Sequence, residues 1–254
     1  MKEPTPVAAV CDRRVRVGGH SPPLRESSAF TLLELLVVIG LIAALSFALF
    51  AGLTGGSRSA ALQSGQGTIS TLVTAARAKA AAANRKTRLL VNVDPGCPDR
   101  YLRFIVFQLA RQAGSSPVDW DTEQAIQLPD GIYVVPAMLA GVVADGSEWK
   151  RITSPADDLV SDVFQNQGLS WAIEGDDAAQ AWTGVAFTAN GTIAALASGP
   201  PPRGFLVVAR GRARVPGTFA MGDPPVELTD PRAVRGLVLS AYGVPALLNE
   251  RSAF

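Results

Sequence analysis

The stretch FTLLELLVVIGLIAALSFALFAGL, residues Phe30 to Leu53, decides how the rest of this chain is organised. Between Leu35 and Leu53 it contains no charged residue. As an α-helix that rises about 1.5 Å per residue, this run spans roughly 28 Å, which is close to the roughly 30 Å hydrocarbon core of a bilayer. The stretch therefore predicts a membrane-spanning helix over residues 30–53, with a single carboxylate, Glu34, near its start.

Residues 1–29 are rich in proline and basic residues and show no hydrophobic periodicity. Arginines beside a membrane span stay on the cytoplasmic side, so these residues predict a cytoplasmic leader and place the chain beyond Leu53 outside. The alternative is a secretory signal peptide that is cut after Ser46-Phe47-Ala48. The length of the apolar run and the presence of Glu34 argue against that alternative.

Composition limits the classes of function. With 254 residues, 48% of them hydrophobic, the chain can build one or two packed domains. Its net charge of +1 does not attract nucleic acid, and no nucleic-acid partner is expected. The only histidine is His20, and the two cysteines are Cys11 and Cys97. A chain cut before Phe30 would keep only Cys97 of these three, which argues against a disulfide framework, histidine-dependent catalysis and most zinc sites.

The run Ala29-Phe30-Thr31-Leu32-Leu33-Glu34, with a basic leader before it and the apolar run after it, resembles the N-terminal motif of type IV pilins and type II secretion pseudopilins. The resemblance implies that prepilin peptidase cuts after Ala29 and that the new N-terminal Phe30 is N-methylated. The family usually has Gly at the position of Ala29. The resemblance also implies other pilin or pseudopilin subunits, an inner-membrane assembly platform and membrane lipid as partners.

Glu34 calls for an explanation, because an intramembrane carboxylate is costly unless it is paired and is functional by default. The resemblance implies that Glu34 faces the Phe30 amine of a neighbouring subunit during filament assembly. The alternative is that Glu34 only extends to the polar interface at the membrane edge.

Residues 54–87 read as an amphipathic continuation of the helix. The run Thr54-Gly55-Gly56 predicts a break or kink, because Gly weakens a helix by about 1 kcal/mol relative to Ala. Basic residues between Arg77 and Lys86 indicate the helix end rather than a nucleic-acid patch. Apolar residues recur at spacings of three, four and seven, which predicts one face that packs on a globular domain. These residues are Ala61, Leu62, Ile69, Leu72, Val73, Ala76, Ala80 and Ala83.

Residues 88–254 change to the pattern of strands, which predicts an antiparallel sheet packed on the helix and an α+β class. Asn190-Gly191 marks the best hairpin, because Asn-Gly suits turns with positive φ. The junction at Arg88 and the strand entry Leu128-Pro129-Asp130-Gly131 resemble the pseudopilin H group, so a pilin-like fold is expected. The predicted strands are Arg88–Val93, Tyr101–Leu109, Ile132–Val135, Gly184–Thr188, Thr192–Leu196, Gly204–Ala209 and Ala233–Leu239, and Tyr242–Leu248 is expected to close the sheet.

An irregular acidic insertion is predicted at about residues 141–181. Clustered carboxylates can hold calcium, but no spacing here matches an EF-hand loop. The insertion is therefore expected to form solvated surface, and no metal or cofactor is expected. The four tryptophans, Trp120, Trp149, Trp171 and Trp182, are expected to be core or loop anchors, with a ligand groove as the alternative.

No catalytic motif is present, and Cys97 has no histidine to activate it outside the leader. The sequence therefore predicts a structural subunit and not an enzyme. It would be a minor pilin or pseudopilin that crosses the inner membrane once, keeps its globular domain in the periplasm and assembles through its N-terminal helix into a type II secretion pseudopilus or a type IV pilus. Two alternatives stay open: a bitopic anchor whose outer domain binds a partner without polymerising, and an anchored enzyme with an unrecognised carboxylate pair.

Overall fold

The computed structural model describes residues 31–112, 119–137, 141–143, 146–164, 169–173, 178–196 and 204–254, with the backbone alone for residues 48–58. The chain divides into two compact units, Met1–Phe50 and Ala51–Phe254. The predicted leader and the predicted cut between Ala29 and Phe30 lie outside the described residues.

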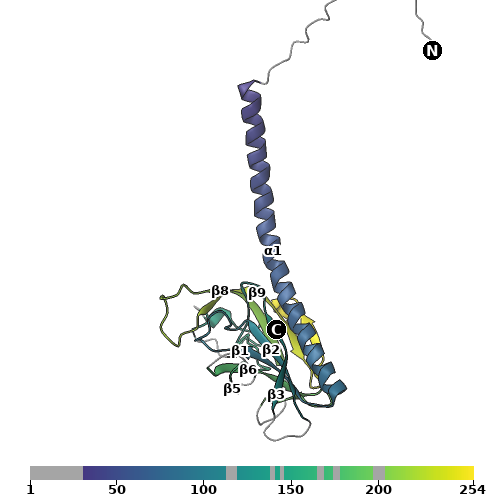
Figure 1. Ribbon diagram of the computed structural model, residues 1–254. Coiled ribbons are helices and arrows are strands. Elements are labelled where there is room, and N and C mark those ends of the chain that lie inside the picture. The colour runs from purple at the N-terminus through teal and green to yellow at the C-terminus, as the bar shows by residue number, and fades with distance from the viewer. Residues whose placement is uncertain are drawn as a thin grey trace, which may run out of the picture. The chain divides into compact units, whose positions relative to one another are not determined.

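The helix α1 (Leu32–Ala83) opens the described chain (Figure 1). Its backbone stays helical through Thr54-Gly55-Gly56, so the predicted break there is wrong. Each Gly costs a helix about 1 kcal/mol relative to Ala. That cost is tolerated because a helix that is already formed on both sides gains one hydrogen bond for every residue it adds.

In the second unit, α1 buries the apolar face that its sequence predicts. Ile69, Val73 and Ala76 are at most 1% exposed, whereas Ala61 and Ala83 at the margins of the face are only partly buried. A polar residue also lies on this face: the amide Nε2 of Gln66 donates to the carbonyl oxygens of Gly236 (2.8 Å) and Leu248 (2.9 Å). These two bonds tie the helix to the C-terminal strands.

The helix ends in a Schellman turn. Asn84 has a φ of 49°, in the left-handed region that Asn tolerates better than most residues. The N–H of Arg85 donates to the carbonyl of Ala80 (3.1 Å), and the N–H of Asn84 donates to that of Ala81 (3.3 Å). The helix therefore ends at Ala83, within the basic run but before the predicted residue 87, and its last turn contains no basic residue.

The first antiparallel sheet packs one face against α1 (Figure 1). Its central strand pairs on both sides, because Leu89 lies opposite Phe107 on one neighbour and Val185 on the other. In spatial order the strands are β3 (Trp120–Gln127), β2 (Phe104–Ala110), β1 (Thr87–Asn92), β6 (Gln180–Phe187) and β5 (Leu169–Trp171), and β7 (Ile193–Ala194) also pairs with β6.

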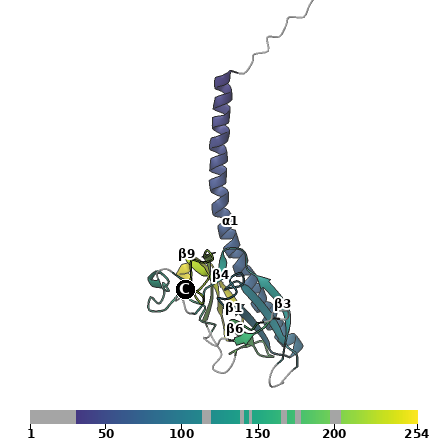
Figure 2. The same cartoon turned by 60° about the vertical axis from the view of Figure 1, so that its left-hand side comes forward.

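The second antiparallel sheet is formed mainly by the last part of the chain (Figure 2). The segment that was expected to close the sheet does so as its last strand. In spatial order the strands are β10 (Pro245–Leu248), β9 (Val226–Leu239), β8 (Gly204–Ala213) and β4 (Ile132–Val134).

The main core lies between α1 and both sheets. Ile69 of the helix shares it with Leu89 and Val185 of the first sheet and Leu206 and Leu237 of the second. The class is α+β, with a helix packed against antiparallel sheets. The prediction of a single sheet is wrong, because alternation along a strand shows which face is buried and not which strands pair.

The predicted hairpin forms between β6 and β7. In its loop, the N–H of Thr188 donates to the carbonyl of Thr192 (2.8 Å), and Gly191 takes a φ of 75°. A residue without Cβ adopts this conformation freely, which explains why Asn190-Gly191 predicted the turn.

Several strands differ from expectation. β5 lies inside the predicted insertion and was not predicted, and β6 and β9 begin at Gln180 and Val226, before their predicted starts at Gly184 and Ala233. The strand predicted from Tyr101 begins at Phe104, because Leu102 has a φ of 56° and its N–H donates to the carbonyl of Asn92 (2.8 Å). The strand β3 was not predicted, since most of its side chains are exposed and polar. Edge strands are commonly polar because they face solvent.

The predicted acidic insertion covers part of the second sheet instead of forming solvated surface alone. Trp149 and Leu159 are at most 2% exposed and pack in one core with Tyr133 and Val207 of that sheet. The described residues also include the short 3₁₀ helix η1 (Gly146–Glu148). The prediction of solvated surface was based on the overall acidic composition of the segment, which does not show that apolar residues between the acidic ones form a buried face.

Candidate functional site

The described N-terminal end of α1 carries a reciprocal cap. The carboxylate Oε2 of Glu34 accepts hydrogen bonds from the backbone N–H and the hydroxyl of Thr31, both at 3.0 Å. In return, the N–H of Glu34 donates to the Thr31 hydroxyl oxygen (3.2 Å). This is a capping box, in which two backbone donors that the helix leaves unpaired are satisfied.

The capping box directs the Glu34 carboxylate toward the start of the chain's own helix. A negative charge there is favourable, because the N-terminal end of a helix carries a partial positive charge. Ala29 and Phe30, the predicted processing residues, lie outside the described residues. In the structure Glu34 therefore caps its own helix, a role that was not predicted, and the pairing with a neighbouring subunit stays a prediction.

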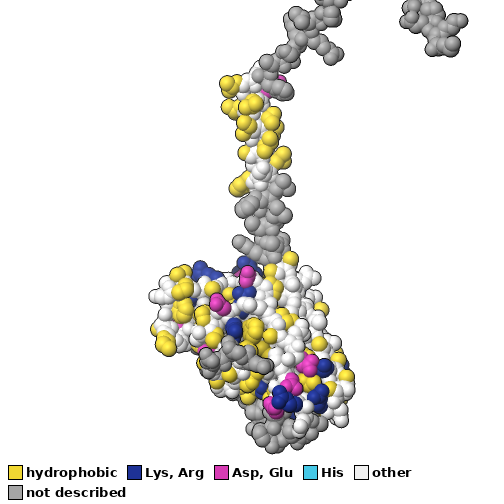
Figure 3. Space-filling view, viewed as in Figure 1, with side chains coloured by type: hydrophobic (Ala, Val, Ile, Leu, Met, Phe, Trp, Pro, Cys, Tyr) yellow, Lys and Arg dark blue, Asp and Glu magenta, His cyan; other side chains and the backbone are white. Residues whose placement is uncertain are grey.

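The residues that follow the cap expose an apolar surface. Every side chain described from Thr31 to Phe47 is exposed, with Leu32 at 82% and Phe47 at 77% (Figure 3). Soluble proteins rarely leave contiguous apolar surface of this kind uncovered, and such a patch marks contact with protein or membrane.

No helix among the residues that the structure describes is both long and apolar enough to cross a membrane. The predicted span, Leu35–Leu53, runs past Phe47 into residues whose side chains lie outside the description. The span therefore stays a prediction.

In the second unit, Arg88 is a cation buried on the face of the first sheet that points away from α1. It is 7% exposed, and its Nε donates to Oε1 of Gln108 at 2.6 Å. The guanidinium carbon lies 4.2 Å from the ring centre of Trp120 and 5.9 Å from that of Trp171. Burial lowers the pKa of Arg88 to about 10, and the aromatic faces offset part of the cost of desolvation.

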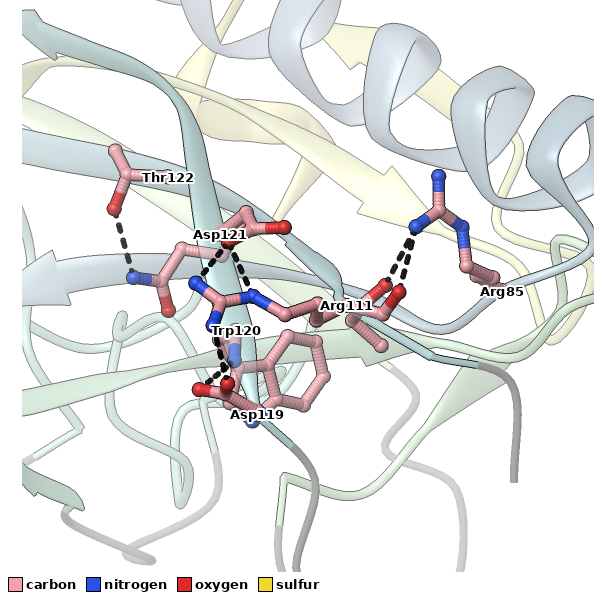
Figure 4. A network of polar contacts seen from close by, with 8 residues as sticks. Arg85, Arg111, Asp119, Trp120, Asp121 and Thr122 are labelled. Carbon is pink, nitrogen blue, oxygen red and sulfur yellow. Dashed lines mark hydrogen bonds and ion pairs between the residues drawn. The ribbon is translucent and has the colours of Figure 1, made fainter. Parts of the chain in front are cut away.

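A polar network fixes the neighbouring edge of the first sheet (Figure 4). Arg111 lies between two carboxylates, with Nη1 at 2.9 Å from Asp119 and Nη2 at 2.7 Å from Asp121. Arg85, just beyond the end of α1, donates to the carbonyl oxygen of Arg111 (2.9 Å). Exposed pairs of this kind add little stability singly, so the network links the ends of β2 and β3 to the residues after α1 without being a main source of stability.

The described residues contain no group of three or more His, Cys, Asp or Glu that could hold a metal ion. In the acidic insertion, Asp158 pairs with Lys150 and Asp162 pairs with Arg151. The other acidic residues from Glu174 to Asp177 lie outside the description. Cys97 lies in the turn after β1, where its side chain is partly exposed and forms no disulfide with any residue that the structure describes. Two of the tryptophans, Trp149 and Trp182, are core residues as expected.

Comparisons of the chain with models of known protein families, with curated proteins and with solved structures found no match. No relative therefore supplies a function. The functional argument rests on the chain's own residues, and among these the start of α1 combines a conspicuous sequence motif with an uncovered apolar surface.

Two features of these sites were not predicted from the sequence. The capping box could have been found, because Thr31-x-x-Glu34 before an apolar run is its sequence signature. The cluster around Arg88 could not, because Trp120 and Trp171 meet Arg88 only through the pairing of strands that are far apart in the sequence.

Proposed function

We propose that this chain is a minor pilin or pseudopilin, a structural subunit that polymerises through its N-terminal helix. The observation that carries the proposal is the uncovered apolar surface of residues 32–47, on a helix that begins directly after the processing motif Ala29-Phe30. Lipid covers this surface before assembly, and the helices of other subunits cover it in the filament. No catalytic step is part of this function.

Processing prepares the helix for assembly. Prepilin peptidase cuts between Ala29 and Phe30, and Phe30 is then N-methylated. The new ammonium group lies one residue before Thr31, whose N–H already donates to Glu34. In the filament, the Glu34 carboxylate gives up part of its bonding to Thr31 and pairs with the Phe30 ammonium group of a neighbouring subunit. A charge surrounded by apolar helices is stabilised best by an opposite charge.

The second unit supports the closer assignment to the pseudopilin H group. The strand entry Leu128-Pro129-Asp130-Gly131 leads directly into β4, and the end of α1 leads within a few residues into β1. In this reading the chain crosses the inner membrane once, the α+β unit lies in the periplasm, and the partners are other pilin or pseudopilin subunits and the inner-membrane assembly platform.

Mass spectrometry of the mature N-terminus tests the proposal. The full chain is expressed in a host with its prepilin peptidase and in the same host without the enzyme. We expect an N-methylated Phe30 only where the peptidase is present. An intact Met1 in both hosts, or a cut near Ala48, would overturn the proposal and favour a plain membrane anchor or a secreted domain.

Crosslinking distinguishes a filament subunit from a bitopic anchor that binds a partner alone. Photoreactive residues placed at Leu36 and Leu45, both exposed in α1, should capture other pilin-type subunits through their own N-terminal helices. Ile152 is exposed on the second unit and serves as the control position, which should not give these products. Capture of lipid alone at Leu36 and Leu45 would contradict assembly.

A further inference from the structure

A pocket of about 390 Å³ in the second unit is lined by three arginines. It lies where the first packed turns of α1 meet β8 and β9. Ser59 and Leu62 of the helix and Asn249 beyond β10 also line it. The arginines are Arg210, Arg232 and Arg235.

A bulge in β9 brings the arginines together. Ala209 of β8 pairs with Val234, but the next residue, Arg210, pairs with Asp230. Residues 231–233 therefore have no partner on β8. A bulge bends a strand and re-aims its side chains, and here it turns Arg232 to the same pocket as Arg210 and Arg235.

The three guanidinium groups lack acidic partners. Among the described residues, no carboxylate lies within ion-pair distance of any of them, whereas Arg103, Arg151 and Arg212 elsewhere in the unit each have one. The nearest acid in the strand register, Asp230, uses Oδ1 to accept the backbone N–H groups of Arg232 (2.9 Å) and Ala233 (3.3 Å). Within the described part of the chain, the three arginine side chains donate a single hydrogen bond, a long one from Nη1 of Arg235 to Oε1 of Gln66 (3.4 Å).

We propose that this pocket binds a phosphate group. Three cations without counter-charges repel one another, and an anion in the pocket removes that repulsion. The planar guanidinium fork matches the oxygens of phosphate in a bidentate manner. A tetrahedral anion can face three arginines at once, whereas a carboxylate has only two oxygens, so the arrangement favours phosphate.

Two sources can supply this phosphate: the headgroup of an anionic phospholipid, or a free phosphate compound. The lipid source rests on the proposed function. Ser59 in the pocket wall follows Leu53, the end of the predicted span, by about 9 Å of helix. Basic groups next to a membrane span attract anionic lipid. The phosphate site itself stands without that function, because all of its lining residues belong to the second unit.

The experiment uses the full chain in a neutral detergent at constant ionic strength. Calorimetry measures the binding of inorganic phosphate with sodium chloride as the blank, and then of mixed micelles that contain phosphatidylglycerol or phosphatidylcholine. The variants are Arg210→Gln and Arg232→Gln. Arg212→Gln is the matched control, because Arg212 lies on the same strand and its removal costs the same charge, but its partner is Glu227 outside the pocket (2.8 Å).

We expect each pocket variant to bind phosphate at least about tenfold more weakly than the parent, which corresponds to the loss of one charge-assisted contact. The control should change by less than about twofold. If the chain binds phosphatidylglycerol micelles more tightly than phosphatidylcholine micelles, and inorganic phosphate displaces the former, the ligand is a lipid headgroup. If it binds inorganic phosphate but binds both kinds of micelle equally, the ligand is a free phosphate compound.

Two results would overturn the site: no binding of phosphate or phosphatidylglycerol by the parent, or a weakening in the Arg212→Gln control that equals the weakening in the pocket variants. Arg232 is exposed, so its variant keeps the test valid if Arg210→Gln fails to fold. The phosphate titration needs neither cleavage nor a membrane, so its failure is distinct from failure of the proposed function.

Discussion

Replacing Glu34 by Gln separates the two roles that its carboxylate can have. Gln keeps an oxygen that can accept from the Thr31 N–H, a contact of 3.0 Å in the structure, but carries no charge. Glu34→Ala removes the charge and both bonds that the carboxylate accepts from Thr31, and keeps only the bond from the N–H of residue 34 to the Thr31 hydroxyl. A cap is worth about 1 kcal/mol, a factor of about five in an equilibrium. A buried ammonium group left without its partner costs about 3–5 kcal/mol, a factor above about 100.

The assay is the fraction of the chain recovered in sheared filaments, measured by quantitative immunoblotting. We expect both Glu34→Gln and Glu34→Ala to lower that fraction by more than about 100-fold. The matched control is Thr31→Ala, which removes the two bonds of the Thr31 hydroxyl and keeps the Glu34 charge, and its loss should be about fivefold or less. Mass spectrometry of Phe30 in each variant separates a defect in processing from a defect in assembly.

Filament recovery at the parental level for Glu34→Gln, together with a loss for Glu34→Ala, would refute the pairing. The carboxylate would then act only on its own helix. A loss for Thr31→Ala as large as that for Glu34→Gln would also refute the reasoning, because it would make the cap, and not the charge, the requirement for assembly.

Ile69→Ala should lower the free energy of unfolding by about 2–5 kcal/mol, because Ile69 is 1% exposed between α1 and the sheets. Ile152→Ala, at a side chain 55% exposed, should change it by less than about 0.5 kcal/mol, and equal effects in urea titrations would contradict this packing. Gly184→Ala should lower the free energy of unfolding by at least about 1–3 kcal/mol, because the new Cβ would meet the Leu89 carbonyl. Gly67→Ala, in open space on α1, should raise it by up to about 1 kcal/mol. An unchanged free energy of unfolding for Gly184→Ala would be inconsistent with the close approach of β6 to β1. Burial raises the pKa of Tyr101 to about 12 from 10.0, so the stability held by its neutral phenol is present below pH 10 and is lost as the pH rises from about 10 to 12. Tyr101→Phe should reduce the fall in the free energy of unfolding between about pH 10 and 12, measured by circular dichroism. An unchanged fall would contradict this role of Tyr101.

The sequence predicts well where structure depends on neighbouring residues. The apolar face of α1 around Ile69, the helix end near Asn84 and the turn at Gly191 all follow from residues within a few positions of one another. Helical periodicity and the tolerance of Asn and Gly for positive φ are local properties. For the same reason, the capping box of Thr31 and Glu34 was within reach of the sequence.

The partners of buried polar groups depend on contacts across the fold. Arg88 meets Trp120 and Trp171 because β1 lies between β2 and β6, and the order of strands is not encoded in the alternation of any one of them. The arginine pocket has the same origin. Arg210 and Arg232 come together only because residues 231–233 bulge out of β9.

By itself, the sequence determined that a long helix with an apolar first part precedes the strands, that this helix acquires one buried face, and that the arrangement is α+β. These properties follow from the period of apolar side chains and from local turn chemistry. Only the tertiary structure decided that the strands form two sheets, that the acidic insertion covers one of them, and which cations are left without acidic partners. The physical reason is that strand pairing joins segments far apart in the chain, and each pairing places side chains against neighbours that their own segment does not specify.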